Sequence, residues 1–333
     1  MPAEIPVLRE GIALFDQGKY DEAIDRFDRV LQTNPDNDTA MYESANAYWR
    51  KREYQKALDL AAKATQVNSP SLPAVYALIG NVLDDAGHPD QAIEVYKKGI
   101  ALNMPNSGTV YLNMAVTQTA LRDVAGAKAT FKLGALVDPN TPGIHFNLAT
   151  IYGAQGLKTP ALLAMSRQLI LEPSSQRAGP TYNAWRALLD SRTPPLPPQG
   201  HPLSDYIRSA QQTSEGNQTA LDAALIASKM AATAVANSQI QTLVDQVDHL
   251  FSAYASMSAG DDKDTFLWKY YIPYFVELKQ KGFVEPFVYF LSLRTNLSGV
   301  REWMTANPDK VNTFLLWSRT YKWPDKNSVD PAR

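Results

Sequence analysis

The sequence of 333 residues predicts an all-α protein, a solenoid of five helical hairpins with a capping helix, followed by a small helical domain. The first observation is a repeat, marked by small residues that recur every 34 or 35 positions: Ala23, Ala57, Ala92, Ala127 and Ala161. A period of this length is typical of helical hairpins stacked side by side. The second observation is the apolar periodicity of residues 203–333, which remains helical although the repeat is lost.

A second small residue precedes each of these alanines by twelve positions, at Gly11, Ala45, Gly80, Ala115 and Ala149. Two helices that cross closely need a small side chain from each at the crossing point. An apolar residue, often aromatic, follows each alanine one turn later, as Phe27, Tyr96 and Phe131 do. The pattern therefore predicts two antiparallel helices in every repeat.

The turns between the paired helices have a common position where three repeats carry glycine, at Gly18, Gly87 and Gly156. A glycine just past a helix adopts the left-handed conformation that ends it. Arg52 and Arg122 occupy the same position in the other two repeats. We expect those two turns to be tighter or more strained, because a side chain disfavours that conformation.

Prolines close the repeat units. Together with the small-residue pairs, the turn glycines and the aromatic residue they form a pattern that resembles the tetratricopeptide repeat family over about residues 4–174. Five copies keep the same register, although Glu10 and Ser44 stand where an apolar residue is usual. The predicted repeats are about 4–37, 38–72, 73–107, 108–141 and 142–175, with a capping helix at 179–192, within a solenoid of 4–192.

The resemblance implies that one face of each first helix lines a concave groove that binds a protein or peptide. The groove positions with candidate binding side chains are Tyr42, Asn46, Trp49, Asn81, Asp84, Asp85, Asn113, Phe146, Asn147 and Thr150. Tyr42 and Trp49 are the candidate anchors, since large aromatic residues are favoured at binding surfaces. The asparagines either bond the local backbone, the preferred interpretation, or hold the amides of an extended ligand. Some members of the family hold a terminal carboxylate with a clamp of lysine and arginine. That clamp is not expected here, because the positions of its basic residues are occupied by Leu8, Ala77 and Leu78.

The segment 193–202 is rich in proline, which predicts a stiff extended linker rather than a ligand of an SH3 domain. In the C-terminal domain, 203–333, Asn217 is expected to cap a helix, and Ser238 with Gln241 forms a capping box. Asp261, Asp262 and Asp264 are interpreted as helix-capping residues rather than a metal site.

Aromatic residues are dense in TFLWKYYIPYFVELKQKGFVEPFVYF, residues 265–290, where Pro273 and Gly282 predict two short helices. The preferred interpretation is a domain core, with Trp268 and Trp317 mostly buried. A partly open aromatic pocket or docking surface is the alternative. A membrane span is not predicted, because the stretch contains Lys269, Glu277 and other charged residues.

Composition and motifs indicate no catalytic, metal or cofactor site. The chain has no cysteine, and its 32 basic and 34 acidic residues are evenly distributed, so a nucleic-acid surface is not expected. The four histidines, His88, His145, His201 and His249, have no metal-ligand spacing. The opening MPAEIPVLREG has no signal-peptide pattern, so we expect a cytoplasmic location by default. Zero cysteine also suits an exported form whose signal was removed.

Two functional hypotheses follow. The first is a non-catalytic scaffold or adaptor that binds a protein or peptide in the groove. The alternative is a C-terminal domain that binds or transforms a small molecule in an aromatic pocket, with the repeats as a targeting arm. A closed C-terminal core favours the first, and a deep cavity with convergent polar groups favours the second. The oligomeric state is left open.

Overall fold

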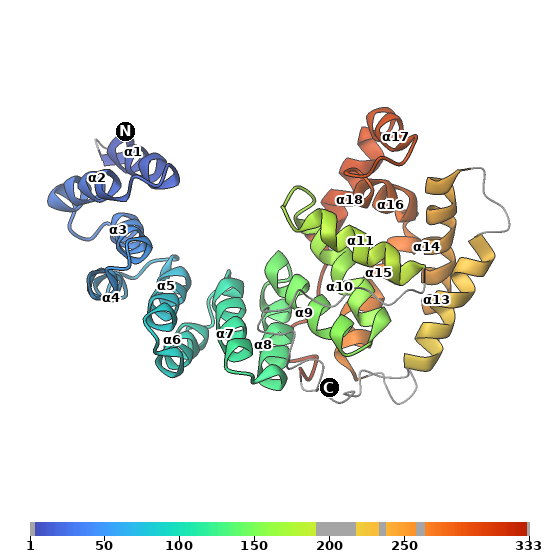
Figure 1. The fold of residues 1–333 in the computed structure, drawn as a ribbon, viewed down its shortest axis with the longest axis horizontal. Coiled ribbons are helices and arrows are strands. Elements are labelled where there is room, and N and C mark those ends of the chain that lie inside the picture. The colour runs from blue at the N-terminus through green and yellow to red at the C-terminus, as the bar shows by residue number, and fades with distance from the viewer. Residues whose placement is uncertain (1–3, 191–217, 233–237, 258–263, 332–333) are drawn as a thin grey trace. The chain divides into compact units, whose positions relative to one another are not determined.

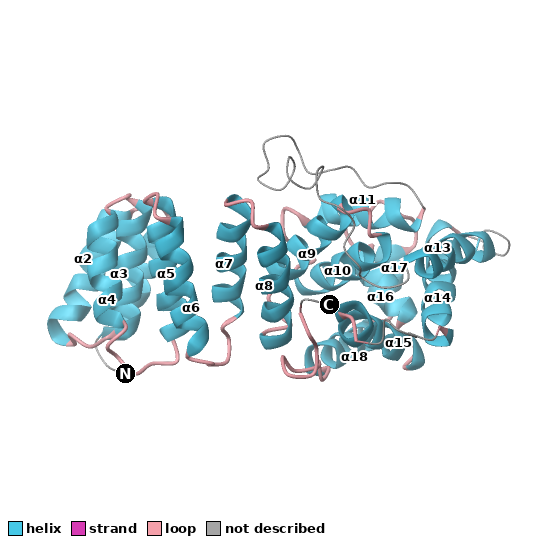
Figure 2. Cartoon of the chain, turned by 90° about the horizontal axis from the view of Figure 1, so that it is seen from below, coloured by secondary structure: helices cyan, strands magenta, loops and turns pink. Residues whose placement is uncertain are grey.

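The protein is described by a computed structural model at residues 4–190, 218–232, 238–257 and 264–331. Over these ranges the chain forms helices and loops and contains no strand (Figure 2), which confirms the all-α prediction. The contacts divide it into two compact units, Met1–Ala127 and Lys128–Arg333. Each unit is described separately below. No helix in the described ranges has the length and apolar character needed to cross a membrane.

The first unit contains helices that pair into successive hairpins (Figure 1). Their bounds are α1 Glu4–Asp16, α2 Tyr20–Thr33, α3 Asp38–Arg50, α4 Tyr54–Ala64, α5 Leu72–Asp85, α6 Pro89–Ala101 and α7 Gly108–Ala120. Each first helix also contacts the first helix of the next hairpin, in the pairs α1 with α3, α3 with α5 and α5 with α7. The faces of α3, α5 and α7 therefore lie side by side, as the solenoid prediction requires.

Glycine in a first helix makes room for an aromatic ring from its partner helix. A Cβ atom built on Gly80 would lie 2.1 Å from Cε1 of Tyr96, and one on Gly11 would lie 2.5 Å from Cε1 of Phe27. Both rings are fully buried, with 1% and 0% of their surface exposed. The close approach predicted at these positions is present, but its partner is the aromatic residue that follows the repeat alanine by one turn.

Two residues that depart from the repeat pattern have different environments. Glu10 is exposed and forms an ion pair with Arg26 at 3.0 Å, so its charge is solvated. Ser44 is fully buried, and its hydroxyl has no hydrogen-bonding partner in the described structure. The buried hydroxyl has a cost that an alanine would not have.

The five turn residues all adopt the left-handed conformation. The φ angles are 77° at Gly18, 87° at Gly87 and 75° at Gly156, and they are 61° at Arg52 and 66° at Arg122. The strained turns predicted at the two arginines are confirmed. Both side chains are exposed, so the strain is confined to the backbone.

Arg122→Gly is expected to stabilise the first unit by about 0.5–1 kcal/mol, because glycine removes the left-handed strain and offsets its own entropy cost. The matched change is Gly87→Ala, where no atom lies within 4 Å of the new Cβ. We expect it to destabilise the unit by about 1 kcal/mol through the backbone alone. Urea unfolding followed by circular dichroism measures both, and equal shifts of the same sign would contradict this account.

In the second unit the helices are α9 Pro142–Ala154, α10 Lys158–Leu171, α11 Ala178–Leu189, α13 Gln218–Ala232, α14 Gln239–Ser256, α15 Ile272–Gln280, α16 Val284–Leu291, α17 Val300–Ala306 and α18 Pro308–Thr320. A π-helical turn at Leu267–Tyr271 precedes α15, and α8, Val124–Val137, contains the division between the units.

The second unit is built around α10, which is buried on all sides from Thr159 to Ile170. Its sequence, KTPALLAMSRQLIL, is apolar around most of the helix, as expected for a helix without a solvent face. It contacts α9, α11, α13, α16 and the π-helical turn. The last predicted hairpin, α9 and α10, thus shares one core with the C-terminal helices. The limits predicted for the repeats and the linker stay a prediction, and 193–202 lies outside the described residues.

The dense aromatic segment is mainly core. Tyr270, Tyr271, Tyr274, Phe275 and Phe287 are 0% exposed. Helix α15 begins beside Pro273 after the π-helical turn, and Gly282 follows the helix with a φ of 74°. Trp268 and Trp317, predicted to be mostly buried, lie at the edge of this core and keep a minor part of their surface exposed.

Some of the local features predicted for the second unit can be compared with the structure, and others cannot. Helix α11 buries Trp185, Leu188 and Leu189, as expected of a capping helix. The Ser238 hydroxyl accepts a hydrogen bond from the Gln241 backbone N–H at 3.2 Å, which confirms that half of the capping box. Other predictions fall outside the described residues, namely those for Asn217, Asp261, Asp262 and His201.

Candidate functional site

The candidate anchors Tyr42 and Trp49 lie on one face of α3, two turns apart, together with Asn46. All three side chains are half-buried. The two rings pack against a cluster of buried residues that includes Ala45 and Ala57. The Trp49 Nε1–H donates a hydrogen bond to Oδ2 of Asp85 at 2.8 Å, which joins α3 to α5. The aromatic rings are thus held in place and keep part of their surface open to solvent.

The predicted residues of α5 divide into two roles. Asn81 accepts a hydrogen bond from the Tyr96 hydroxyl at 2.8 Å, and Asp84 accepts one from the Thr117 hydroxyl at 2.7 Å. These bonds connect α5 with α6 and α7, so both residues help to hold neighbouring helices. Asp85 is exposed, and its described hydrogen-bonding partner is Trp49. On α7, Asn113 is half-buried and has no side-chain partner in the described part of the chain.

Acidic side chains accumulate on the same helices. Burial and the nearby Asp16 carboxylate raise the pKa of Glu43, while a hydrogen bond from Asn46 opposes the shift. Burial and the charge of Glu43 likewise raise the pKa of Tyr42. Such shifts arise where ionisable groups are desolvated and lie close to other negative charges.

Four carboxylates of this region, Asp16, Glu43, Asp84 and Asp85, form no ion pair with any described residue. Arg50, which follows Trp49, has its Nε 3.4 Å from the Tyr20 hydroxyl instead. We call these carboxylates, with Tyr42, Asn46, Trp49, Asn81 and Asn113, the first-helix surface, because all lie on α1, α3, α5 or α7. It combines unpaired negative charge with two aromatic rings.

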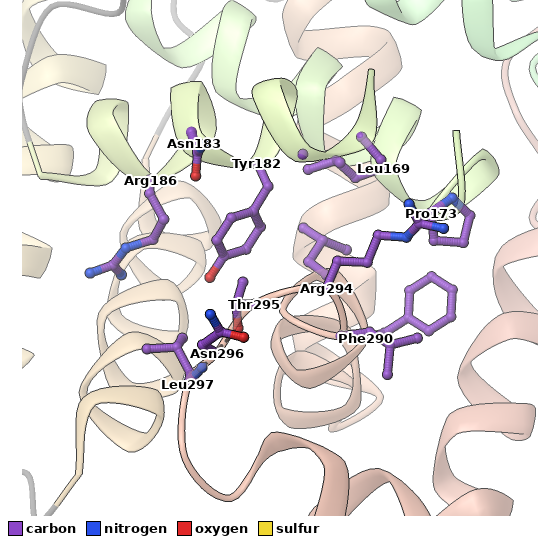
Figure 3. Close-up of a pocket in the computed structure, with 14 residues that line it drawn as sticks. Leu169, Pro173, Tyr182, Asn183, Arg186, Phe290, Arg294, Thr295, Asn296 and Leu297 are labelled. Atoms are coloured by element: carbon purple, nitrogen blue, oxygen red, sulfur yellow. Dashed lines mark hydrogen bonds between the residues drawn. The ribbon is translucent and has the colours of Figure 1, made fainter. Parts of the chain in front are cut away.

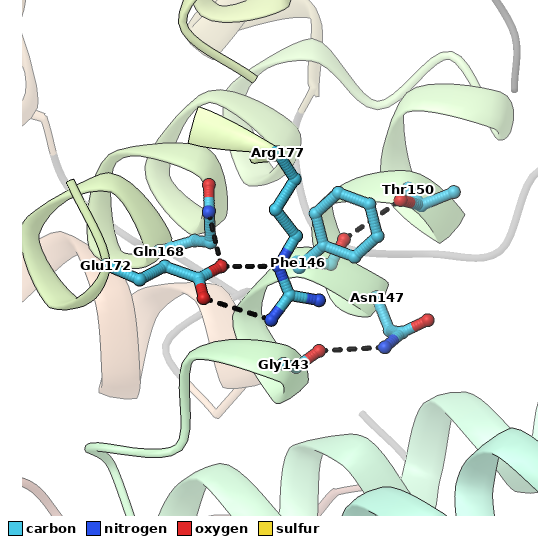
Figure 4. A network of polar contacts seen from close by, with 7 residues as sticks. All are labelled: Gly143, Phe146, Asn147, Thr150, Gln168, Glu172 and Arg177. Carbon is cyan, nitrogen blue, oxygen red and sulfur yellow. Dashed lines mark hydrogen bonds and ion pairs between the residues drawn. The ribbon is translucent and has the colours of Figure 1, made fainter. Parts of the chain in front are cut away.

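The three remaining predicted residues, Phe146, Asn147 and Thr150, belong to the second unit, on α9. Figure 4 shows the Arg177 guanidinium beside the Phe146 ring, 4.9 Å from its centroid. Arg177 also binds both carboxylate oxygens of Glu172, at 2.6 and 3.0 Å. The Phe146 face is therefore covered by a cation that is already paired.

Asn147 and Thr150 bond to their own helix. The Asn147 amide donates to the Gly143 carbonyl at 2.8 Å, and the Thr150 hydroxyl donates to the Phe146 carbonyl at 2.9 Å (Figure 4). For Asn147 this geometry agrees with the preferred interpretation, an asparagine that bonds the local backbone.

The one fully buried histidine of the described chain, His145, has both ring nitrogens occupied. The Pro139 carbonyl can only accept, so Nε2–H donates to it at 3.0 Å, and the Tyr271 hydroxyl then donates to Nδ1 at 2.8 Å. Burial and the neighbouring Arg167 lower the pKa of His145 to about 3. It is a neutral core residue without a free nitrogen. His88 and His249 are exposed, and no cluster suited to a metal ion occurs in the described ranges.

Sequence reasoning missed two arginines of the second unit. Arg186 of α11 and Arg294, after α16, line one hollow with a volume of about 530 Å³. The two residues are far apart in the chain and neither lies in a motif, so no sequence signal associates them.

Family comparison agrees with the repeat pattern and covers the start of the chain. Models described as tetratricopeptide repeat match residues 8–73 and 73–103. A TPR repeat-containing protein of Methanocaldococcus jannaschii is 31% identical over 109 residues, which are 33% of this chain and 19% of that protein. The small glutamine-rich tetratricopeptide repeat-containing protein 2 of Mycosarcoma maydis is 22% identical over 120 residues, 36% of this chain and 34% of that protein. The chain thus matches about a third or less of the length of these relatives.

Among solved structures, a thermophilic TPR protein of Thermus thermophilus is similar with a TM-score of 0.45 and 23% identity, over 56% of this chain and 99% of that one. The repeat register, the paired helices and the family models agree with one another. Residues 8–103 therefore match the tetratricopeptide repeat family.

Proposed function

We propose that this protein is a non-catalytic scaffold whose first-helix surface binds a basic segment of a partner protein. The tetratricopeptide repeat fold supports a protein-interaction role in general. The observation that carries the finer proposal is the set of four carboxylates that have no ion pair among the described residues, next to two half-buried aromatic rings. Lysine and arginine are the side chains that complement such a surface.

The two kinds of group act on the same partner side chains. Carboxylates attract lysine and arginine and speed their encounter with the surface. The faces of Tyr42 and Trp49 add cation–π attraction, which is worth about 0.5–1 kcal/mol at exposed sites. Because the Trp49 indole is fixed by Asp85 at 2.8 Å, its ring is already ordered before binding.

The test is selection from a random peptide library on the full-length chain, followed by titration of the selected peptides. We expect enrichment in lysine and arginine, with affinities that fall as salt is raised. Peptides without basic residues, or affinities independent of salt, would contradict the proposal.

A charge-neutral variant, Glu43→Gln with Asp84→Asn and Asp85→Asn, keeps the shape of the surface and removes three charges. We expect it to bind the selected peptides about tenfold more weakly through lost Coulomb attraction, because the asparagine oxygens can still accept the hydrogen bonds from Trp49 and Thr117. Its matched control neutralises exposed acids of α2 and the following turn, as Glu22→Gln, Asp25→Asn and Asp36→Asn. Equal losses in both variants would show that net charge, rather than this surface, decides binding.

The aromatic pair is tested with Tyr42→Ala and Trp49→Ala together. We expect peptide binding to weaken while stability changes by about 1–2 kcal/mol, because both side chains are only half-buried. Unchanged affinity in this variant would place binding elsewhere on the chain.

A further inference from the structure

The hollow of about 530 Å³ in the second unit lies between α11 and the segment that follows α16 (Figure 3). Tyr182, Asn183 and Arg186 come from one face of α11, and residues 293–297 form the opposite side. Its volume falls in the range of small-molecule sites, about 300–1,000 Å³. It is built independently of the first-helix surface, so it goes beyond the proposed function.

The charge of its lining is positive. Arg186 and Arg294 line it, and no aspartate or glutamate does so among the described residues. Arg186 is 3.7 Å from Asp190, too far for a hydrogen bond, and Arg294 has no partner in the described structure. Glu172 lies next to the lining residue Pro173 in the chain, but Arg177 already binds both of its oxygens.

Neutral donors accompany the two guanidinium groups. The side-chain amides of Asn183 and Asn296 have no hydrogen-bonding partner within the described ranges. The Tyr182 hydroxyl is 3.1 Å from Oγ of Ser292, which fixes the ring between the two sides. Burial raises the pKa of Tyr182, so this hydroxyl stays neutral and keeps its proton.

Apolar side chains form the rest of the wall, with Leu169, Pro173 and Phe290 on the side of Arg294. In Figure 3, Arg294 extends past Phe290 toward Pro173, while Arg186 lies on the other side of Tyr182. A cation therefore stands beside an apolar wall, and further donors lie beyond it.

We propose that this hollow binds a small amphipathic organic anion. Its acidic group pairs with Arg294, its apolar body lies against Phe290, Leu169 and Pro173, and a polar end, where present, reaches Arg186. A guanidinium binds carboxylate and phosphate with the same two-pronged geometry, so the head group is either of these. An uncharged lipid or alcohol would leave the guanidinium of Arg294 without a partner.

The experiment is calorimetric titration of the full-length chain with probes that share one tail, namely octanoate, octyl phosphate and octanol. We expect octanoate or octyl phosphate to bind at least about tenfold more tightly than octanol, since a charge-assisted hydrogen bond contributes about that much. The tighter of the two anions identifies the head group. Inorganic phosphate, which lacks the tail, is expected to bind more weakly than octyl phosphate.

Three variants locate the site. Arg294→Gln removes the cation from an exposed position. We expect it to weaken binding of the two anionic probes at least about tenfold, with little change in the binding of octanol. Gly179→Leu fills the hollow from α11. No atom lies within 4 Å of the new Cβ, so we expect the helix to remain intact. Binding of all three tailed probes should be lost. Arg319→Gln, an exposed arginine of α18 outside the lining, is the matched control and should bind as the unaltered chain does.

The proposal is overturned if no tailed anion binds at millimolar concentration, or if octanol binds as tightly as both anions. It is also overturned if Gly179→Leu binds like the unaltered chain while folded by circular dichroism. Because no peptide is present, none of these outcomes depends on the first-helix surface.

Discussion

Gly80→Leu is expected to destabilise the first unit by about 3 kcal/mol or more, at the upper end of overpacking costs. Even a single added carbon at this position would lie 2.1 Å from the ring of Tyr96. That ring is buried, and its hydroxyl is bonded to Asn81, so it cannot rotate away without losing a hydrogen bond. Helices α5 and α6 must therefore separate. Hydrogen–deuterium exchange measures the effect within this unit.

Asn81→Ala is the neighbouring control. It removes the acceptor of the Tyr96 hydroxyl but adds no volume, so we expect a loss of about 1–2 kcal/mol. The pair separates steric crowding at the helix crossing from loss of a hydrogen bond. If the two variants show equal protection from exchange in α5 and α6, the assignment of Gly80 to the crossing is wrong.

Tyr274→Ala is expected to cost the second unit about 4 kcal/mol, as large-to-small changes in cores do. The side chain is 0% exposed, and its ring lies 4.9 Å from Trp317 and 4.8 Å from Trp323, measured between centroids. The Arg167 guanidinium lies 5.5 Å from the same ring. The cavity left by alanine would deprive all three groups of contacts. Urea unfolding gives the free energy, and exchange assigns it to the second unit.

Tyr274→Phe retains the ring and removes the hydroxyl that lies 2.7 Å from Oγ of Ser318. We expect it to cost about 1 kcal/mol, because Ser318 still accepts a hydrogen bond from Arg167 at 2.8 Å. Trp317→Ala should fall between the two, near about 2 kcal/mol, since Trp317 is only half-buried. A phenylalanine variant as unstable as the alanine variant would mean that the hydroxyl, rather than the ring, holds this core.

The helical hairpins of the first unit were predictable because their signals are local. A small residue at Gly80 and a turn at Arg122 are each specified by neighbours along the chain, and the repeat multiplies the signal. The residue that contacts Gly80 was harder to predict. Periodicity places Ala92 and Tyr96 on the same helix face, but only the rotation of α6 decides that the ring of Tyr96 reaches the glycine.

The candidate site was predictable in part for the same reason. Periodicity places Tyr42, Asn46 and Trp49 on one face of a helix, and all three are half-buried in the structure. Periodicity alone does not tell which side chains from later in the chain cover such a face. Phe146 occupies an equivalent position in its repeat, yet Arg177, from the turn before α11, lies over its ring.

The sequence by itself determined the helical class, the repeat register, the left-handed turns and the face on which Tyr42 and Trp49 lie. All of these follow from short-range sterics and from a 3.6-residue period. Tertiary structure alone decided that α10 is buried on every side, that four carboxylates form no ion pair within the described part of the chain, and that Arg186 and Arg294 line one hollow. These are contacts between residues distant in the chain, and they depend on how helices pack rather than on the order of residues within them.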